Sequence, residues 1–245
     1  MLKISAVSYL NTYPFVYGLQ QSGLLDKFKL ELDVPSVCAS KLKNNQADIA
    51  LVPVGALPDF DQYELTSCYC IGAVNQVKTV LLLSKVPLNQ VSKVHLDFDS
   101  RTSVRLVRVL AKHCWQITPE WVGLQPGQAS KLTAVESMVA IGDKTFALRA
   151  HFPYVYDLAE EWIGFTGLPF VFAVWLSLKK VPEALLLPFE NALDFGVRNI
   201  PACLNHFKNS LPAGVDCREY LEKNISYILD EEKRKGLDKF LAYLR

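Results

Sequence analysis

Hydrophobic and polar positions follow two different periods along the first part of the chain. Residues 2–7 and 47–54 are short apolar runs and residues 28–34 alternate, which is the pattern of buried and half-buried strands. The segments between them begin at Pro14 and Pro35. Proline suits the first turn of a helix because that turn leaves its N–H groups unpaired. This order of strand, helix, strand, helix and strand predicts a parallel sheet covered by helices.

The middle of the chain contains further strand-like segments, rich in β-branched, aromatic and small apolar residues. They occupy residues 65–74, 78–84, 94–98, 120–122, 139–142 and 170–175. Residues 78–84 and 170–175 are almost continuously apolar, which favours strands buried on both faces that cross between two lobes. A short helix is expected before Val139 and a helical turn at residues 156–162.

The remainder of the chain has helical periodicity. The expected helices span residues 183–199 with a break near Pro188, then 202–207, 216–229 and 231–244. Asp216, followed three residues later by Glu219, resembles a capping box at the start of the third of these helices.

Polar loops follow three of the predicted strands. The first carries Ser8 and Asn11, with Asn11 or Thr12 placed to cap a helix that Pro14 can begin. Ligands of open α/β sheets bind at the carboxyl ends of strands, so this loop is a candidate wall of a site. The alternative interpretation is a capped strand-to-helix turn and nothing more.

The second polar loop comes after residues 94–98, and the third comes after Ile141. The second contains Ser100, Arg101, Thr102 and Ser103 at the start of a helix, where unpaired N–H groups and the helix dipole favour a carboxylate or phosphate. The third contains Gly142 and Asp143, and Asp143 is expected to cap a helix rather than to touch a ligand. Simple capping by Ser or Thr stays an alternative for the second loop.

Composition narrows the possible functions. The chain has 245 residues, half of them hydrophobic, and 26 Lys and Arg against 25 Asp and Glu. This balance gives no indication of a nucleic-acid or membrane partner. No apolar run reaches the roughly 20 residues of a membrane span, and the N-terminus has no signal-peptide pattern, so a soluble cytoplasmic protein is expected.

No residue spacing in the chain is typical of a metal or nucleotide site. The six cysteines are expected to be reduced thiols, and neither a phosphate-binding loop nor a dinucleotide fingerprint is present. The four histidines stand singly in unlike contexts, so none of them is assigned as a base.

Several ordered motifs together resemble the chorismate dehydratases of the futalosine route to menaquinone. They are VSYLNT at residues 7–12 with Pro14, DIALVPV at 48–54, DSRTS at 99–103, IGD at 141–143, YDL at 156–158 before Trp162, and TGLPFVFAVW at 166–175. The resemblance covers most of the chain. It implies an α/β, two-lobed fold of the type II periplasmic-binding-protein kind, with hinge strands near residues 79–83 and 170–175. One lobe would comprise residues 1–80 and 175–245, with a helical C-terminal segment, and the other residues 81–174.

The same resemblance implies a lyase that removes water from chorismate, a small dicarboxylate, without a metal or an organic cofactor. Asn11 matches a family active-site position, and Thr79 stands where the family is expected to carry a serine. Ser100, Thr102 and Ser103 would hold a carboxylate, with Arg101 holding charge or facing solvent. Ser8, Gly142 and Asp143 complete the expected substrate-binding residues.

Two other functions stay open at this point. The cleft could belong to a cytoplasmic binding protein that closes on a small carboxylate without reacting it. It could also belong to the sister enzyme that acts on cyclic dehypoxanthine futalosine, which would need a catalytic histidine in the middle lobe. The sequence does not decide the oligomeric state.

Overall fold

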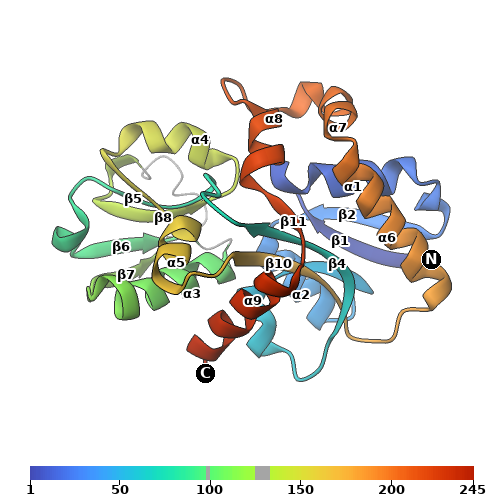
Figure 1. Ribbon diagram of the computed structural model, residues 1–245, viewed down its shortest axis with the longest axis horizontal. Helices are drawn as coiled ribbons and strands as arrows, with labels where there is room; N and C mark the ends of the chain where they lie inside the picture. The colour runs from blue at the N-terminus through green and yellow to red at the C-terminus, as the bar shows by residue number, and fades with distance from the viewer. Residues whose placement is uncertain (98–99, 125–132) are drawn as a thin grey trace.

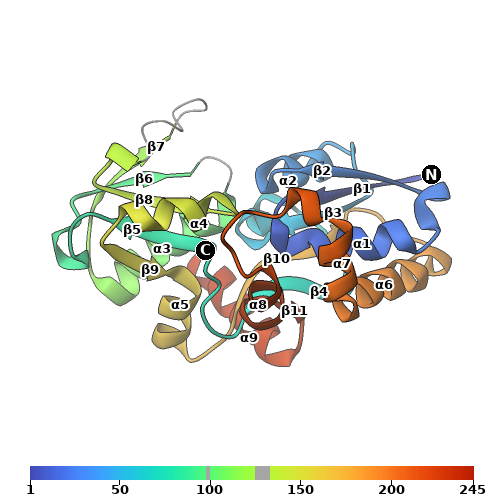
Figure 2. The same ribbon diagram turned by 90° about the horizontal axis from the view of Figure 1, so that it is seen from above.

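Two β-sheets lying side by side organise the chain, as a computed structural model shows for residues 1–97, 100–124 and 133–245 (Figure 1). We call the elements around the six-stranded sheet the first lobe and those around the five-stranded sheet the second lobe. The chain passes from the first sheet to the second between residues 73 and 80, and it returns between residues 166 and 170. Seen from above, the C-terminal elements lie beside the junction of the two lobes (Figure 2).

The six-stranded sheet has the order β11-β4-β10-β3-β1-β2. Its strands are β1 (Leu2–Val7), β2 (Phe28–Asp33), β3 (Ile49–Pro53), β4 (Glu64–Ala73), β10 (Phe170–Ser177) and β11 (Ser226–Ile228). β1 is parallel to β2 and β3, whereas β10 is antiparallel to β3 and β4. The parallel arrangement predicted for the first three strands is therefore confirmed.

Helices of the first lobe follow its strands closely. They are α1 (Tyr13–Gln21), α2 (Pro35–Lys43), α6 (Glu183–Arg198), α7 (Ile200–His206), α8 (Cys217–Glu219) and α9 (Glu231–Tyr243), with the short helices η1 (Leu10–Thr12), η3 (Val54–Asp59) and η9 (Tyr220–Asn224). Pro14 and Pro35 both stand in the first turn of their helices, as predicted. Asp216 also caps α8, accepting a hydrogen bond from the N–H of Glu219.

The five-stranded sheet has the order β7-β6-β8-β5-β9. Its elements are β5 (Val80–Ser84), β6 (Lys93–Leu96), β7 (Glu120–Gly123), β8 (Ser137–Ile141), β9 (Tyr154–Asp157), α3 (Arg101–Leu110), α4 (Lys144–Leu148) and α5 (Leu158–Thr166). Phe98, Asp99 and most of the short helix expected before Val139 lie outside the described residues. Strand β10 pairs with the first sheet along its whole length, from Phe170 to Ser177. The lobe boundaries expected at residues 80 and 175 stay a prediction.

Three local predictions are wrong in part. Residues 158–162 are helical in α5 as expected, but residues 156 and 157 belong to strand β9 beside β5. The helix expected at residues 216–229 ends at Asn224, and residues 226–228 form strand β11 beside β4. Pro188 does not break α6, which runs through it from Glu183 to Arg198. In each case long-range pairing or packing outweighs the local preference.

A shared apolar core joins the lobes near the return crossing. Trp162 of α5 is fully buried, and its ring centroid lies 5.4 Å from that of Phe170 in β10 and 5.9 Å from that of Phe240 in α9. Edge-to-face aromatic pairs of this kind add about 0.5–1.5 kcal/mol each beyond the burial of their surface. The second lobe is therefore anchored on β10 and on the C-terminal helix.

Candidate functional site

A cavity lies between the two lobes, at the carboxyl ends of β1, β3 and β8 and beside the start of α3. Its empty volume is about 520 Å³, including open solvent at its mouth. This falls within the range of small-molecule sites. The described residues that line it are Val7, Tyr9, Asn11, Thr12, Pro35, Pro53, Ile71, Val77, Thr79, Val80, Ser100, Thr102, Ser103, Ile141, Gly142, Phe172 and Ala173.

Most of the predicted site residues meet at this cavity, although they are far apart in sequence. Asn11, Thr79, Ser100, Thr102, Ser103 and Gly142 line it, whereas Ser8, Arg101 and Asp143 are not among its described lining residues. The backbone N–H of Ser8 donates to the carbonyl of Asp33. These positions fit the expected site, and the role of each residue stays a prediction.

Two hydrogen bonds hold Asn11 at the cavity, one to its side chain and one to its backbone carbonyl. Its Oδ1 accepts a hydrogen bond of 3.0 Å from the hydroxyl of Thr12, and its carbonyl accepts one of 3.1 Å from the hydroxyl of Tyr227. Thr12 is the N-cap of α1 but makes no side-chain capping bond, so the predicted cap is wrong. The hydroxyl that would have capped the helix orients the Asn11 amide instead.

Thr79 lies one residue before β5 and is 1% exposed. Its Oγ1 lies 2.8 Å from the hydroxyl oxygen of Tyr220, the first residue of η9. The side chain of Asn11 is near enough to this hydroxyl to lower its pKa, against the larger effect of burial. Burial raises the pKa of Tyr220, so its hydroxyl stays protonated at neutral pH.

The start of α3 is brought to the cavity, but its hydroxyls already have protein partners. Ser100 caps the helix by accepting a 3.0 Å bond from the N–H of Ser103, and the two hydroxyls contact each other. Thr102 Oγ1 accepts a 3.0 Å bond from the N–H of Gly55 and donates one of 3.0 Å to the carbonyl of Phe172. Thr102 therefore ties the second lobe to η3 and β10 of the first.

Arg101 is directed away from the cavity into an ion pair. Its Nη1 lies 2.6 Å from Oδ2 of Asp59, at the end of η3, and Nη2 of Arg105 lies 3.1 Å from Oδ1 of the same carboxylate. These side chains are partly exposed, so each pair contributes about 0–1 kcal/mol. The cluster joins the two lobes at the rim.

Asp143 and Gly142 also contact the first lobe from the end of β8. Both carboxylate oxygens of Asp143 accept from the N–H of Leu10, at 3.1 and 3.2 Å. Asp143 makes no side-chain capping bond to α4, so the predicted cap is wrong here as well. Burial raises its pKa, and the bond from Leu10 opposes that rise.

Gly142 has a positive φ of 69° and faces the ring of Tyr9. A Cβ at this position would lie 2.9 Å from ring atoms of Tyr9, in a conformation that other residues rarely adopt. Glycine thus permits the aromatic side chain of the first lobe to lie directly on the end of β8.

Sequence reasoning missed the contribution of the C-terminal segment. Tyr220 and Tyr227 reach Asn11 from a stretch that the pattern showed only as a helix, and Phe172 was seen only as a hinge residue. The sequence pattern around these two tyrosines does not indicate that they will contact the loop after β1. None of the four histidines is among the described lining residues of the cavity.

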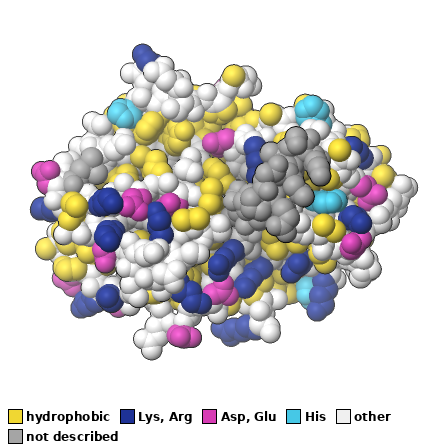
Figure 3. Space-filling model, turned by 180° about the vertical axis from the view of Figure 1, so that it is seen from behind, with side chains coloured by type: hydrophobic (Ala, Val, Ile, Leu, Met, Phe, Trp, Pro, Cys, Tyr) yellow, Lys and Arg dark blue, Asp and Glu magenta, His cyan; other side chains and the backbone are white. Residues whose placement is uncertain are grey.

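Three other features of the described residues bear on function: clusters that could bind a metal, charge at the surface and helices that could span a membrane. No group of three or more His, Cys, Asp or Glu among the described residues could hold a metal ion. The back of the molecule shows Lys and Arg as well as Asp and Glu at its surface (Figure 3). Within the described residues, none of the helices is both long and apolar enough for a bilayer crossing.

Solved structures share this architecture along nearly the whole chain. A protein from Archaeoglobus fulgidus matches with a TM-score of 0.75 at 13% identity, covering 99% of this chain and 96% of that one. The periplasmic aliphatic sulphonate binding protein SsuA from Escherichia coli matches with a TM-score of 0.62 at 14% identity, covering 98% and 91%. The chain therefore belongs to the class of proteins with a periplasmic-binding-protein-like fold, as predicted.

The sequence assigns the family within this class. A family model described as menaquinone biosynthesis matches residues 2–245, so the chain belongs to that family. It is also 26% identical to the chorismate dehydratase of Thermus thermophilus over 265 residues, covering 96% of this chain and 92% of that one. The resemblance drawn from the motifs is therefore confirmed at the level of the family.

Proposed function

We propose that this protein is a hydro-lyase that converts chorismate to 3-[(1-carboxyvinyl)oxy]benzoate in menaquinone biosynthesis. Family membership and the similarity to a chorismate dehydratase support this activity. The structural observation that carries it is the meeting of the Asn11 amide and the Thr79 hydroxyl at one cavity between the lobes. No metal or organic cofactor enters the proposal, and the chemistry is assigned to the cytoplasm.

The reaction breaks two bonds on neighbouring ring carbons. A proton leaves the carbon that carries the enolpyruvyl ether, the allylic hydroxyl leaves the next carbon, and the two depart together as water. Because the ring becomes aromatic, the protein chiefly has to orient the substrate and to stabilise the leaving oxygen. Asn11 and Thr79 are the proposed hydrogen-bond donors to that oxygen.

The proton acceptor is proposed to be a carboxylate of the substrate itself. None of the described lining residues is Asp, Glu, His, Lys or Arg. A carboxylate held beside the ring by the closed lobes can act as a general base, provided that the geometry brings it within reach of the proton. Backbone N–H groups at the start of α3, beside Ser100, Thr102 and Ser103, are the proposed anion holders.

Purified protein incubated with chorismate tests the proposal directly. We expect an aromatic enolpyruvyl ether to accumulate, and Asn11→Ala to lower kcat by about 100-fold or more because it removes one positioned donor. Asn205→Ala is the matched control, since Asn205 is exposed on α7 and is not among the described lining residues of the cavity. Near-normal turnover by Asn11→Ala would remove this residue from the mechanism.

Two other outcomes correspond to the alternatives. A binding protein would return chorismate unchanged while still being stabilised by it against heat. The sister reaction on cyclic dehypoxanthine futalosine would call for a histidine, and the described lining of the cavity holds none. Turnover of that substrate and not of chorismate would overturn the proposal.

A further inference from the structure

The hydroxyl of Tyr220 lies beside the two residues proposed to handle the leaving oxygen. Its oxygen lies 2.8 Å from Oγ1 of Thr79, and the Asn11 side chain is near enough to lower the pKa of Tyr220. Thr79 stands in the crossing to the second lobe and Asn11 in the first lobe, while Tyr220 comes from the C-terminal segment. Tyr220 is 2% exposed and is not among the described lining residues of the cavity, so it acts from behind the site.

We propose that Tyr220 is a positioning residue that orients the Thr79 hydroxyl, beside the Asn11 amide, toward the leaving oxygen of the substrate. The inference rests on the proposed function and adds a third residue to it. It assigns to Tyr220 no contact with the substrate and no proton transfer.

The hydrogen bonds around Asn11 and Thr79 indicate which of their groups can donate to a ligand. Oδ1 of Asn11 is occupied by the hydroxyl of Thr12, which leaves the amide N–H groups to face Tyr220 and the cavity. Between Tyr220 and Thr79 either hydroxyl can donate, and in the proposed arrangement the phenol donates and Oγ1 of Thr79 accepts. The protein acceptor then left for the Thr79 hydroxyl is the carbonyl of Val77, at a long 3.4 Å. The Thr79 proton is thus free to turn to a ligand, and donors linked in series strengthen one another.

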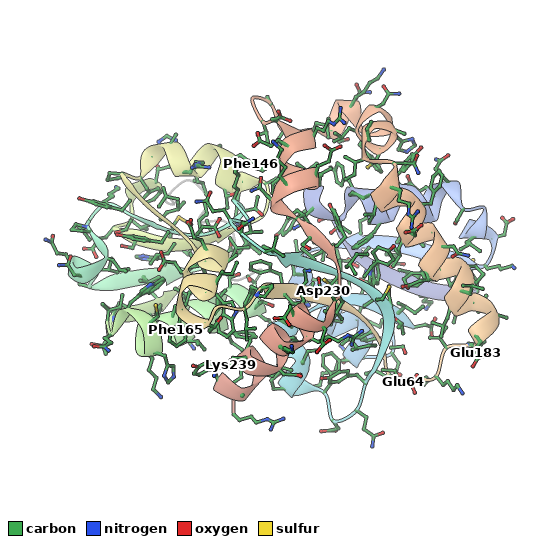
Figure 4. The ribbon with its side chains drawn as sticks, in the orientation of Figure 1. Glu64, Phe146, Phe165, Glu183, Asp230 and Lys239 are labelled. Carbon is green, nitrogen blue, oxygen red and sulfur yellow. The ribbon has the colours of Figure 1, made fainter. Side chains whose placement is uncertain are left out.

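Packing holds the ring of Tyr220 in place. The ring of Phe146, in α4 of the second lobe, meets it edge to face with centroids 5.3 Å apart. Figure 4 shows Phe146 directed from α4 toward the C-terminal segment. Tyr220 therefore links the C-terminal segment to Phe146 of the second lobe and to Thr79 in the crossing. This arrangement is complete only when the lobes are together.

Tyr220→Phe tests the proposal, because it keeps the ring and its packing and removes only the hydroxyl. We expect kcat with chorismate to fall on the order of 100-fold, as for a misplaced catalytic group, with KM changed less than about threefold. Tyr69→Phe is the matched control. Tyr69 is also buried and its hydroxyl also has a side-chain partner, Asp194, but it lies outside the described lining.

A double-mutant cycle separates positioning from general stability. If Tyr220 acts through Thr79, then Thr79→Ala should lower kcat strongly in the wild type and much less in the Tyr220→Phe background. Additive losses, or a Tyr220→Phe enzyme within about twofold of wild-type kcat, would overturn the inference while the wild type still turns chorismate over. A wild type that leaves chorismate unchanged would overturn the proposed function, and this inference with it.

Discussion

At Gly55 the backbone of the first lobe lies close against the backbone of the second. A Cβ built there would lie 2.6 Å from Cα of Thr102 and 2.7 Å from the carbonyl oxygen of Arg101, both backbone atoms of α3. Backbone atoms cannot turn aside as the end of a flexible side chain can. Gly55→Ala therefore has to push η3 and α3 apart and stretch the bond between the Gly55 N–H and Thr102, now 3.0 Å.

The cost of this substitution falls on the closed arrangement of the lobes. Overpacking of a tight contact costs about 1–3 kcal/mol. Because 1.4 kcal/mol corresponds to a factor of ten, the equilibrium constant for closing falls by roughly 5- to 150-fold. If only the closed form is productive, kcat/KM for chorismate falls by up to the same factor. For a chain of this length the same cost lowers the melting temperature by only about 2–4 °C per kcal/mol.

Steady-state kinetics together with thermal unfolding measure both quantities. Gly164→Ala is the matched control, because a Cβ at this exposed position in α5 meets nothing within 4 Å. Alanine is favoured over glycine inside a helix by up to about 1 kcal/mol, so this variant should be as stable as the wild type and fully active. The reasoning is refuted if Gly55→Ala has kcat/KM within twofold of the Gly164→Ala control.

Three further predictions concern the residues around the cavity. Burial raises the pKa of Asp143 above its ordinary value of 3.8, so the stability that its protonated form contributes is present below pH 3.8 and is lost as the pH rises through the folded pKa. The melting temperature should fall over that range of pH. Asp143→Asn, whose side-chain oxygen can still accept from the N–H of Leu10, should abolish this fall. Thr102→Val should lower the free energy of unfolding by about 1–3 kcal/mol and also raise KM, because it leaves a buried N–H and a buried carbonyl unpaired. Thr79→Ser should retain activity in a chorismate turnover assay and Thr79→Val should lose it, since only serine can still bond Tyr220.

The central strands could be predicted from the sequence because their signals are local. Apolar runs bounded by Pro14 and Pro35 define β1, β2 and β3 without reference to the rest of the chain. Strands β9 and β11 are short edge strands, and they gain their conformation from pairing with β5 and β4. Pro188 stays within α6 because the following residues, including Phe189, are buried against the first lobe. No window of neighbouring residues contains that information.

The candidate site could be predicted only in part, for a reason that lies in the cost of burying charge. The sequence directed attention to Arg101 and Asp143 as partners of a charged ligand, yet the structure uses both to join the lobes. An ionised side chain pays a large desolvation penalty inside a small cavity, whereas at the rim it keeps part of its hydration and can still bridge two surfaces. Neutral groups such as Asn11 and Thr79 can be buried because hydrogen bonds satisfy them, from Thr12 to Asn11 and between Tyr220 and Thr79. Charged residues thus assemble the closed form and neutral residues line the cavity it encloses, a division that only the folded chain reveals.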